Sequence, residues 1–386
     1  MPVTLLHTSD WHVGKAIRGA SRADEHRAVL AEIADMAASH DVDVVLVAGD
    51  LFDSATPSPE SEQVVYEALL ALARTGAAVA VIAGNHDNSR GLRAVAPLLA
   101  LGNVHLVAEP QRPGDGGVLS ITTGDGTPVR IAMLPFVSKR GIVRAADLMD
   151  AEAFENAQRY SDRLRLLIEA LCGTFTDDAV NVLMAHTFVL GAVQGGGERP
   201  AHLVDEYAVA AASFPPSIGY GALGHLHRAQ RVPAGAALHY CGSPLQLDFG
   251  AGDHPQQVNI VTAAAGLPAD VRAARLTAGR RLRTVYGSID ELASLDIADD
   301  PWLRVVIRGE RQAGLADDVR RLLGPRVVDV RVDVPDAARQ TARRDHRGRS
   351  PQELFGEFLR AHGIADERID SLFAELLDDA LEVPSA

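Results

Sequence analysis

The sequence predicts an α/β protein whose functional side chains gather at one edge of a sheet. Apolar runs of strand length recur through roughly the first 275 residues and alternate with stretches of helical spacing. Short motifs of Asp, Asn and His directly follow these runs, and open α/β folds build their sites at the carboxyl ends of strands. The runs are VTLLHTS, VDVVLVA, AAVAVIA, VNVLMA and YGAL.

Four stretches between these strands predict helices. In the first of them, apolar residues from Val29 to Met36 recur at helical spacing. A glycine-rich segment follows the fourth apolar run, and its Gly195–Gly197 core fits either a flexible surface loop or a loop that faces substrate. The predicted helices span residues 22–39, 58–75, 90–100 and 152–173.

A smaller α/β unit is predicted at residues 276–336, after a main domain at 1–275. Strands and helices alternate in it, and it contains no metal-type motif. Because the pattern changes where those motifs stop, we expect a separate domain. Its predicted strands are 281–286, 302–307 and 327–332, and its predicted helices are 289–295 and 315–323.

Two further segments follow this unit. Residues 337–350 contain five arginines, which fit either a solvated linker or a contact with DNA or a partner. Residues 351–386 contain two amphipathic helices, and a pair of short helices cannot bury an apolar face alone. The face therefore packs either on its own domain or against a partner helix.

Composition and charge restrict the class of protein. With 386 residues, 47% apolar and 23% charged, the chain has an ordinary globular composition, and no apolar run reaches the length of a membrane span. We expect no signal peptide, because the first strand begins at Val3. Cys172 and Cys241 are the only cysteines, which suits a reducing cytoplasm better than a disulfide framework.

The net charge of −14 argues against non-specific nucleic-acid binding by the whole surface. A local DNA groove remains compatible with it, since metals neutralise the carboxylates of a site. All but two of the 37 basic residues are arginine, Lys15 and Lys139 being the lysines. The arginine excess fits a GC-rich genome or selection for phosphate recognition.

The motifs together form a donor set for two divalent ions. Asp50 is the candidate bridge, because a carboxylate can bind two ions about 3.5–4 Å apart. In extended segments, residues two apart turn to one side, which applies to the first and last pairs of the set. Mixed oxygen and imidazole donors fit manganese, iron or zinc. The predicted ligands are Asp10, His12, Asp50, Asn85, His186, His225 and His227.

Three neighbouring residues are expected to assist. His86 stands beside Asn85, and its imidazole can protonate a leaving oxygen or stabilise negative charge at a phosphate. Asp87 and Asp53 can orient a histidine ligand from behind. By contrast, we expect His7 and His105 to have structural roles, since neither lies in a ligand motif.

At these motifs the chain resembles the calcineurin-like metallophosphoesterase superfamily, and within it the SbcD family of nuclease subunits. The resemblance is carried by LLHTSDWHVGK, Gly49–Asp53, Gly84–Asp87 and Gly224–His227. Phosphoprotein phosphatases of the superfamily have Asp-Arg-Gly in the second motif. Here that segment reads Asp-Ser-Ala at 53–55, which disfavours them.

The resemblance implies a role for each matching position. Asp10, His12, Asp50 and His227 would hold one metal, and Asp50, Asn85, His186 and His225 the other. His86 would be the catalytic histidine, and manganese the metal. The implied fold is a four-layer α-β-β-α sandwich of two sheets between helices, followed by a small α/β capping domain that helps to seat DNA and a C-terminal helical tail.

The resemblance also implies partners and an activity. The tail would bind an SbcC-type ATPase, and helices near 58–72 or 90–100 would form a homodimer. The expected enzyme is a metal-dependent exonuclease on double-stranded DNA and endonuclease on single strands and hairpins, acting in DNA end processing, repair, recombination and replication. Two alternatives are a small-molecule phosphodiesterase or nucleotidase on the same scaffold and a non-catalytic DNA tether.

Overall fold

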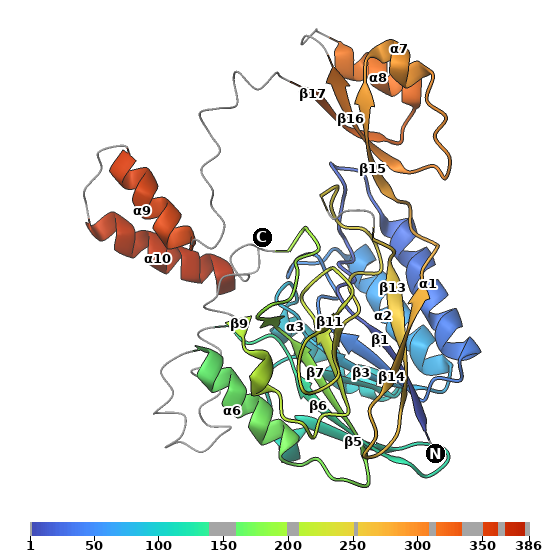
Figure 1. Cartoon of the computed structure of the whole chain (residues 1–386), viewed down its shortest axis with the longest axis vertical. Helices are drawn as coiled ribbons and strands as arrows, with labels where there is room; N and C mark the ends of the chain where they lie inside the picture. Colours follow the sequence, from blue (N-terminus) through green and yellow to red (C-terminus); the bar gives the residue numbers. More distant parts are fainter. Residues whose placement is uncertain are drawn as a thin grey trace.

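The computed structural model describes most of the chain and confirms the α/β class. Two six-stranded sheets face each other, and helices lie on both outer faces (Figure 1). A three-stranded domain and a pair of helices follow. The described residues are 2–138, 160–198, 208–250, 254–308, 314–333, 350–361 and 367–382.

The first sheet has the strand order β14-β13-β1-β2-β3-β4. Strands β1 to β4 are parallel, and β13 and β14 add antiparallel strands beside β1. Helices α1, α2 and α3 pack on its outer face. The bounds are β1 Val3–Thr8, α1 Ala23–Ser39, β2 Val44–Ala48, α2 Pro59–Arg74, β3 Ala78–Ile82, α3 Ser89–Ala100, β4 Val104–Val107, β13 Gln257–Ala263 and β14 Asp270–Arg275.

The second sheet has the order β11-β12-β10-β7-β6-β5, with helix α6 on its outer face. Its central strands β6, β7, β10 and β12 are parallel. The bounds are β5 Val118–Thr122, β6 Pro128–Leu134, α6 Tyr160–Cys172, β7 Val180–His186, β10 Tyr220–Gly224, β11 Gln230–Val232 and β12 Leu238–Tyr240. A short pair, β8 Phe188–Val189 and β9 Ala208–Val209, and two 3₁₀ turns, Pro113–Asp115 and Ala211–Ser213, complete the layer.

The apolar core between the sheets explains their pairing. Along β2, Leu46 and Ala48 face the second sheet, whereas Val45 and Val47 face the helices, and all four are fully buried. A strand buried on both faces needs a continuous apolar run, which is the pattern that the sequence shows. Each buried valine or leucine contributes about 1.5–3 kcal/mol of burial free energy. The arrangement is the four-layer sandwich that the resemblance implied.

The helices begin where the sequence provides caps. Ser58 accepts a hydrogen bond from the Ser61 N–H at the start of α2, and Asn88 accepts one from the Gly91 N–H at the start of α3. The observed helices α1, α2 and α3 lie within one residue of the predicted spans at each end. The predicted helix 152–173 is present as Tyr160–Cys172, and residues 152–159 lie outside the described part of the chain.

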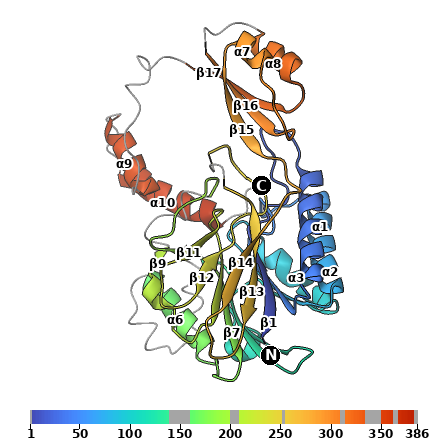
Figure 2. The same cartoon turned by 45° about the vertical axis from the view of Figure 1, so that its right-hand side comes forward.

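The capping module contains the predicted elements in the predicted order. A parallel sheet β15-β16-β17 carries helices α7 and α8 on one side (Figure 2). Ser288 and Glu291 form a capping box at the start of α7. The bounds are β15 Leu282–Gly287, α7 Ile289–Ala293, β16 Trp302–Arg308, α8 Leu315–Leu323 and β17 Val327–Asp333.

A buried polar junction joins this module to the sandwich. The Glu25 carboxylate on α1 accepts hydrogen bonds from Arg22, from the Trp302 Nε1–H at 2.7 Å and from the Arg280 N–H at 2.9 Å. The Arg22 guanidinium also donates to the Gln246 carbonyl at 2.6 Å. Because these buried groups satisfy one another, the module is held against the first turn of α1.

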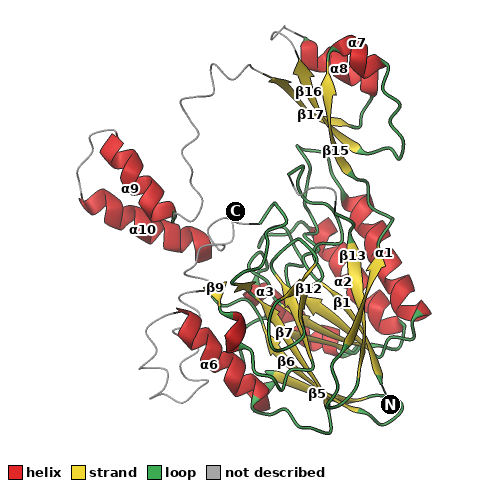
Figure 3. Ribbon diagram, in the orientation of Figure 1, coloured by secondary structure: helices red, strands yellow, loops and turns green. Residues whose placement is uncertain are grey.

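The tail consists of α9, Pro351–Ala361, and α10, Glu367–Glu382 (Figure 3). Phe355 stacks on Phe373 with ring centroids 3.8 Å apart, so the two helices pack on each other. Phe358, Leu372 and Leu376 are more than half exposed. The arginine-rich segment before α9 lies outside the described residues, except Ser350. No helix in the described ranges combines the length and apolar character that a membrane crossing requires.

Candidate metal centre

The sheet topology brings the sequence motifs to one edge of the sandwich. β1, β2 and β3 are parallel in one sheet, β7 and β10 are parallel in the other, and each motif begins at or just after the carboxyl end of its strand. In the residues described there, the seven predicted ligands and His86 come from five separate segments. This convergence follows from strand direction.

Four predicted ligands have an unusual backbone conformation. Asp10, His12, Asp50 and His225 have φ values of 53°, 48°, 52° and 102°, and they are four of the nine described non-glycine residues with positive φ. Such a conformation costs about 1–3 kcal/mol per residue and persists where neighbouring contacts enforce it. Here the Asp10 N–H donates to the Gly49 carbonyl and the His12 N–H to the Asp50 carbonyl. The strain aims these side chains into the site.

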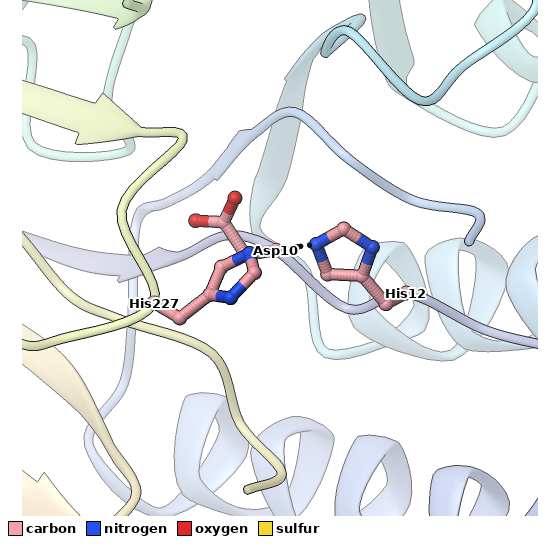
Figure 4. Close-up of side chains that lie close together, drawn as sticks. All are labelled: Asp10, His12 and His227. Atoms are coloured by element: carbon pink, nitrogen blue, oxygen red, sulfur yellow. Dashed lines mark hydrogen bonds between the residues drawn. The ribbon is translucent and has the colours of Figure 1, made fainter. Parts of the chain in front are cut away.

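Asp10, His12 and His227 form the first cluster (Figure 4). The Nε2 atoms of His12 and His227 lie 3.0 Å apart, and one donor atom from each residue lies within 4.8 Å of the others. Asp10 and His12 are almost completely withdrawn from solvent, whereas His227 is partly exposed. One oxygen and two imidazole donors around one point match the coordination preference of a divalent transition metal.

Asp50 lies between this cluster and a second one. Its Oδ2 atom is 3.5 Å from the Nε2 atoms of both His12 and His186. On the far side, the Asn85 Oδ1 atom is 3.0 Å from His186 Nε2 and 2.8 Å from His225 Nδ1. The Asp50 carboxylate therefore lies between two groups of donors, as the predicted bridging ligand should.

Backbone carbonyls orient two of the histidines. The Nδ1–H of His186 donates to the Ala48 carbonyl at 2.8 Å, and that of His227 donates to the Gly196 carbonyl at 2.9 Å. In the neutral imidazole that a metal ligand requires, each bond fixes the tautomer that leaves the Nε2 lone pair facing the cluster. The residues therefore fit a dinuclear centre in donor chemistry and in the direction of the ring nitrogens.

Several buried ionisable groups at this edge have shifted pKa values. Burial, together with the nearby Asp50 charge, raises the pKa of Asp10 to about 8. Burial lowers the pKa of His12 to about 3. Against the effect of burial, the Asp50 carboxylate raises the pKa of His186 to about 9, and the nearby histidines hold the pKa of Asp50 well below its usual range. Divalent ions would supply the positive charge that the two carboxylates need.

His86 lies at the edge of the two clusters. Its backbone N–H donates to Asp50 Oδ1 at 2.8 Å, and its Nδ1–H donates to the Asp53 carbonyl at 2.7 Å. Its ring meets that of His12 edge-on, with centroids 4.6 Å apart. One of its ring nitrogens lies within 4.8 Å of donor atoms of His12 and Asp50, so the imidazole is within reach of a group bound there.

The two predicted supporting aspartates have different contacts. The Asp53 Oδ1 atom lies 3.0 Å from Lys15 Nζ and 3.6 Å from His12 Nδ1. Asp87 does not contact a histidine in this way, because its carboxylate accepts the N–H groups of Leu51, Phe52 and Gly84. Asp53 therefore lies beside a predicted ligand side chain without a hydrogen bond to it, whereas Asp87 holds the backbone around Asp50.

Two glycines permit the close approach of the motifs. A Cβ atom on Gly84 would lie 2.1 Å from Asp50 Oδ1, and one on Gly224 would lie 1.9 Å from the Ala48 carbonyl oxygen of the facing sheet. A Cβ atom at either position would therefore force these groups apart. The glycines of the Gly-Asn-His-Asp and Gly-His-Leu-His motifs are thus required by packing.

Sequence reasoning missed Glu198, which is buried next to His227. Its carboxylate accepts N–H groups from Gly195 at 2.6 Å, Gly196 at 2.7 Å and His227 at 3.1 Å. The glycine loop therefore packs against His227 through the buried Gly195 and Glu198, whereas Gly197 between them is exposed. An acidic residue after three glycines was the available signal, although no spacing rule connects it to a ligand 29 residues later.

The histidines expected to be structural lie outside the clusters. His7 is buried between the sheets, and its Nδ1 atom lies 2.9 Å from the Tyr220 hydroxyl. His105 bonds Asn103 at the opposite end of the strands. Neither side chain belongs to a described group of metal-type donors.

Two family models match this chain. Residues 3–227 match the family model described as calcineurin-like phosphoesterase, which covers more than half of the chain. Residues 278–363 match a second model, described as type 5 capsule protein repressor C-terminal domain. The first match spans the sandwich strands up to the last histidine of the centre.

Similar proteins of known name identify the family within this superfamily. The SbcD subunit of the SbcCD nuclease from Bacillus subtilis is 31% identical over 392 residues, covering 96% of this chain and 97% of that protein. The chain belongs to the SbcD family of calcineurin-like phosphoesterases. The SbcD relative of Rhodobacter capsulatus is 30% identical and covers 91% of this chain and 93% of its own length. That of Escherichia coli K12 is 28% identical and covers 78% and 77%.

Proposed function

We propose that this chain is the nuclease subunit of an SbcCD complex, a hydrolase that cleaves phosphodiester bonds in DNA. The convergence of the seven predicted ligands and His86 at one buried edge carries the proposal. The relatives that match most of this chain are named as SbcD subunits of the SbcCD nuclease. Cleavage would include double-strand exonuclease and single-strand or hairpin endonuclease activity, in DNA end processing, repair, recombination and replication.

Two half-sites would divide the ligands. Asp10, His12 and His227 would hold one ion, Asn85, His186 and His225 the other, and Asp50 both. Bound there, two divalent ions would stabilise charge on the phosphoryl oxygens and provide an activated water as nucleophile. The chain contributes fixed donor directions, since backbone carbonyls and strained φ values hold the side chains before substrate arrives.

His86 would act on the scissile phosphodiester. Its Nδ1–H is held by the Asp53 carbonyl, which leaves the Nε2 atom to contact substrate. From that position the imidazole can donate a proton to the leaving oxygen or stabilise negative charge on the phosphate. Its backbone N–H anchors it to Asp50, so the catalytic group and the bridge move together.

We propose manganese as the metal and the cytoplasm as the location. Three oxygen-donor residues and four imidazoles suit manganese, and no cysteine lies among the ligands. Both cysteines are buried free thiols, which a reducing compartment maintains. Metal content measured after purification without chelator, and restoration of the apoprotein with manganese against zinc and iron, test the first assignment.

DNA would contact an arginine cluster between the sandwich and the capping module. The Asp329 Oδ2 atom lies 3.0 Å from the Nε atoms of Arg304 and Arg331 and 3.5 Å from that of Arg18, which belongs to the loop after the first metal motif. The Arg304 guanidinium also lies over the Phe249 ring at 4.3 Å. Three guanidiniums on one carboxylate leave positive charge on an otherwise acidic chain, as phosphate contacts require.

The salt dependence of DNA binding tests this surface. Arg331→Gln should lower the slope of log K against log salt by about 0.9 for each phosphate that is no longer neutralised. Arg272→Gln is the matched control, because Arg272 makes the same 3.0 Å contact with a carboxylate two residues away, Asp270, on the outer strand β14. Equal slopes for the two variants would exclude the cluster from the DNA interface.

The tail would bind the SbcC-type ATPase. Phe358, Leu372 and Leu376 remain more than half exposed after α9 and α10 have packed on each other, so an apolar surface is left for a partner helix. Leu372→Glu with Leu376→Glu should abolish co-purification with the ATPase and leave manganese-dependent activity of the isolated chain intact.

A homodimer would form through α3. Leu98 and Leu101, at its end, are 69% and 87% exposed, which is unusual for leucine next to a buried helix face. Sedimentation of Leu98→Glu with Leu101→Glu should give a monomer where the unchanged protein gives a dimer.

One assay decides between DNA and small phosphodiesters. End-labelled duplex and hairpin DNA are incubated with the chain and manganese, with and without the ATPase subunit and ATP. We expect cleavage that requires manganese and Asp50 and increases with the partner. Intact DNA under every condition, together with hydrolysis of a generic phosphodiester, would instead establish a small-molecule phosphodiesterase.

A further inference from the structure

Glu198 is a buried acid beside the metal centre that the predicted ligand set does not include. It is 8% exposed, and the other buried glutamate in the described ranges, Glu25, lies at the capping junction. A buried carboxylate needs compensating donors. At Glu198 these donors are three backbone N–H groups, from Gly195, Gly196 and His227.

These contacts hold His227 from two directions. The Glu198 Oε1 atom accepts the His227 backbone N–H directly, at 3.1 Å. The Oε2 atom accepts the N–H of Gly196, whose carbonyl accepts the His227 Nδ1–H at 2.9 Å. One carboxylate therefore fixes the main chain of the ligand and also the peptide that selects its tautomer.

The glycines before Glu198 make this arrangement possible. A Cβ atom on Gly195 would lie 2.6 Å from the Arg228 N atom, which is too close. Gly196 and Gly197 also have φ values of 94° and 87°, which favour glycine. The run allows the loop to approach the His227 segment closely enough for its carbonyl to bond the imidazole.

We propose that Glu198 is a positioning residue that sets the affinity of the Asp10–His12–His227 half-site for a divalent cation. It acts through the Gly196 carbonyl and the His227 main chain and does not itself bind the ion. The inference rests on the dinuclear centre of the proposed function, and it adds that the two half-sites depend on different supports. At the other half-site, the Ala48 carbonyl of β2 orients His186, and Glu198 is not involved.

A manganese titration of the full-length chain tests the proposal. Free Mn²⁺ is followed by electron paramagnetic resonance in metal-free protein, for the unchanged chain and for Glu198→Gln. The amide keeps the size of the side chain but presents an NH₂ group to one of the three N–H donors. We expect one equivalent to bind about 10- to 100-fold more weakly and the other to keep its affinity. Raised manganese should restore activity.

Glu25→Gln is the matched control. Glu25 is equally buried and also accepts a backbone N–H, from Arg280, but it lies at the capping junction. This variant should lower the melting temperature and leave both manganese equivalents unchanged. Two equivalents of unchanged affinity in Glu198→Gln would overturn the proposal, and so would equal weakening of both.

The titration also separates this inference from the proposed function, because it uses no DNA. An unchanged chain that binds two equivalents but leaves DNA intact would refute the nuclease assignment and preserve the role of Glu198. If Glu198→Gln instead binds manganese with unchanged affinities and the unchanged chain cleaves DNA, the role of Glu198 is refuted and the nuclease assignment is preserved.

Discussion

The carboxyl edge of the sandwich and the capping module are built by opposite means. In the capping module, alternating apolar residues, a capping box and parallel strands agree with one another, and each element lies within two residues of its predicted bounds. At the metal edge, four ligands have positive φ values, and two carboxylates are buried together. Agreement between local sequence signals specifies the fold of the capping module. The candidate site instead contains strained backbone and buried charge, which such signals disfavour.

The largest effect is expected from removing the bridge. Asp50→Ala takes away the one carboxylate shared by both half-sites, so both ions should be lost together. Loss of stabilisation worth several kcal/mol corresponds to a fall in cleavage rate on the order of 10³-fold or more. Manganese content and single-turnover cleavage measure it. Retention of one tightly bound ion would mean that Asp50 belongs to one half-site only.

A core truncation in the capping module should separate stability from metal binding. Leu303 is fully buried between the cap sheet and its helices, and Leu303→Ala should lower the free energy of unfolding by about 2–5 kcal/mol. Urea denaturation measures this loss. Manganese affinity should remain that of the unchanged chain, and a parallel fall in affinity would show that the two regions form one cooperative unit.

His86→Ala tests whether this residue binds the metal or acts on substrate. If the imidazole acts on the phosphate, cleavage should fall by about 10²-fold or more while both manganese equivalents and DNA affinity persist. The alternative is that His86 binds the metal, because its ring contacts that of the predicted ligand His12. Loss of a manganese equivalent would place His86 among the ligands.

The smallest effect is expected from adding one methyl group where the sheets meet. Gly224→Ala would put a Cβ atom 1.9 Å from the Ala48 carbonyl oxygen and 2.8 Å from His186 Nδ1. Separating these groups should cost about 1–3 kcal/mol of stability and weaken manganese binding. Gly235→Ala, whose Cβ meets no atom within 4 Å, should change stability by about 0.5 kcal/mol or less.

The sequence predicts those parts of the structure that depend on local signals. The first helices, the capping elements and the meeting of the motifs at one edge follow from periodicity, caps and the direction of parallel strands. The pairing of β1 with β13 was not predicted, because Leu5 and Val261 are partners about 250 residues apart and no local pattern connects them. Glu198 was not predicted for the same reason, because its contact with His227 forms only when the two segments fold together.

The same long-range pairing has a consequence for how the protein is made. β1 is synthesised first, yet its second neighbour β13 leaves the ribosome only after the last histidine ligand. At about 5–20 residues per second, the first strand waits roughly 10–50 s with one side of its backbone uncovered. During that interval it can pair with another chain, as exposed strand edges do. The antiparallel return of β13 and β14 covers this edge, and it follows the synthesis of every predicted ligand.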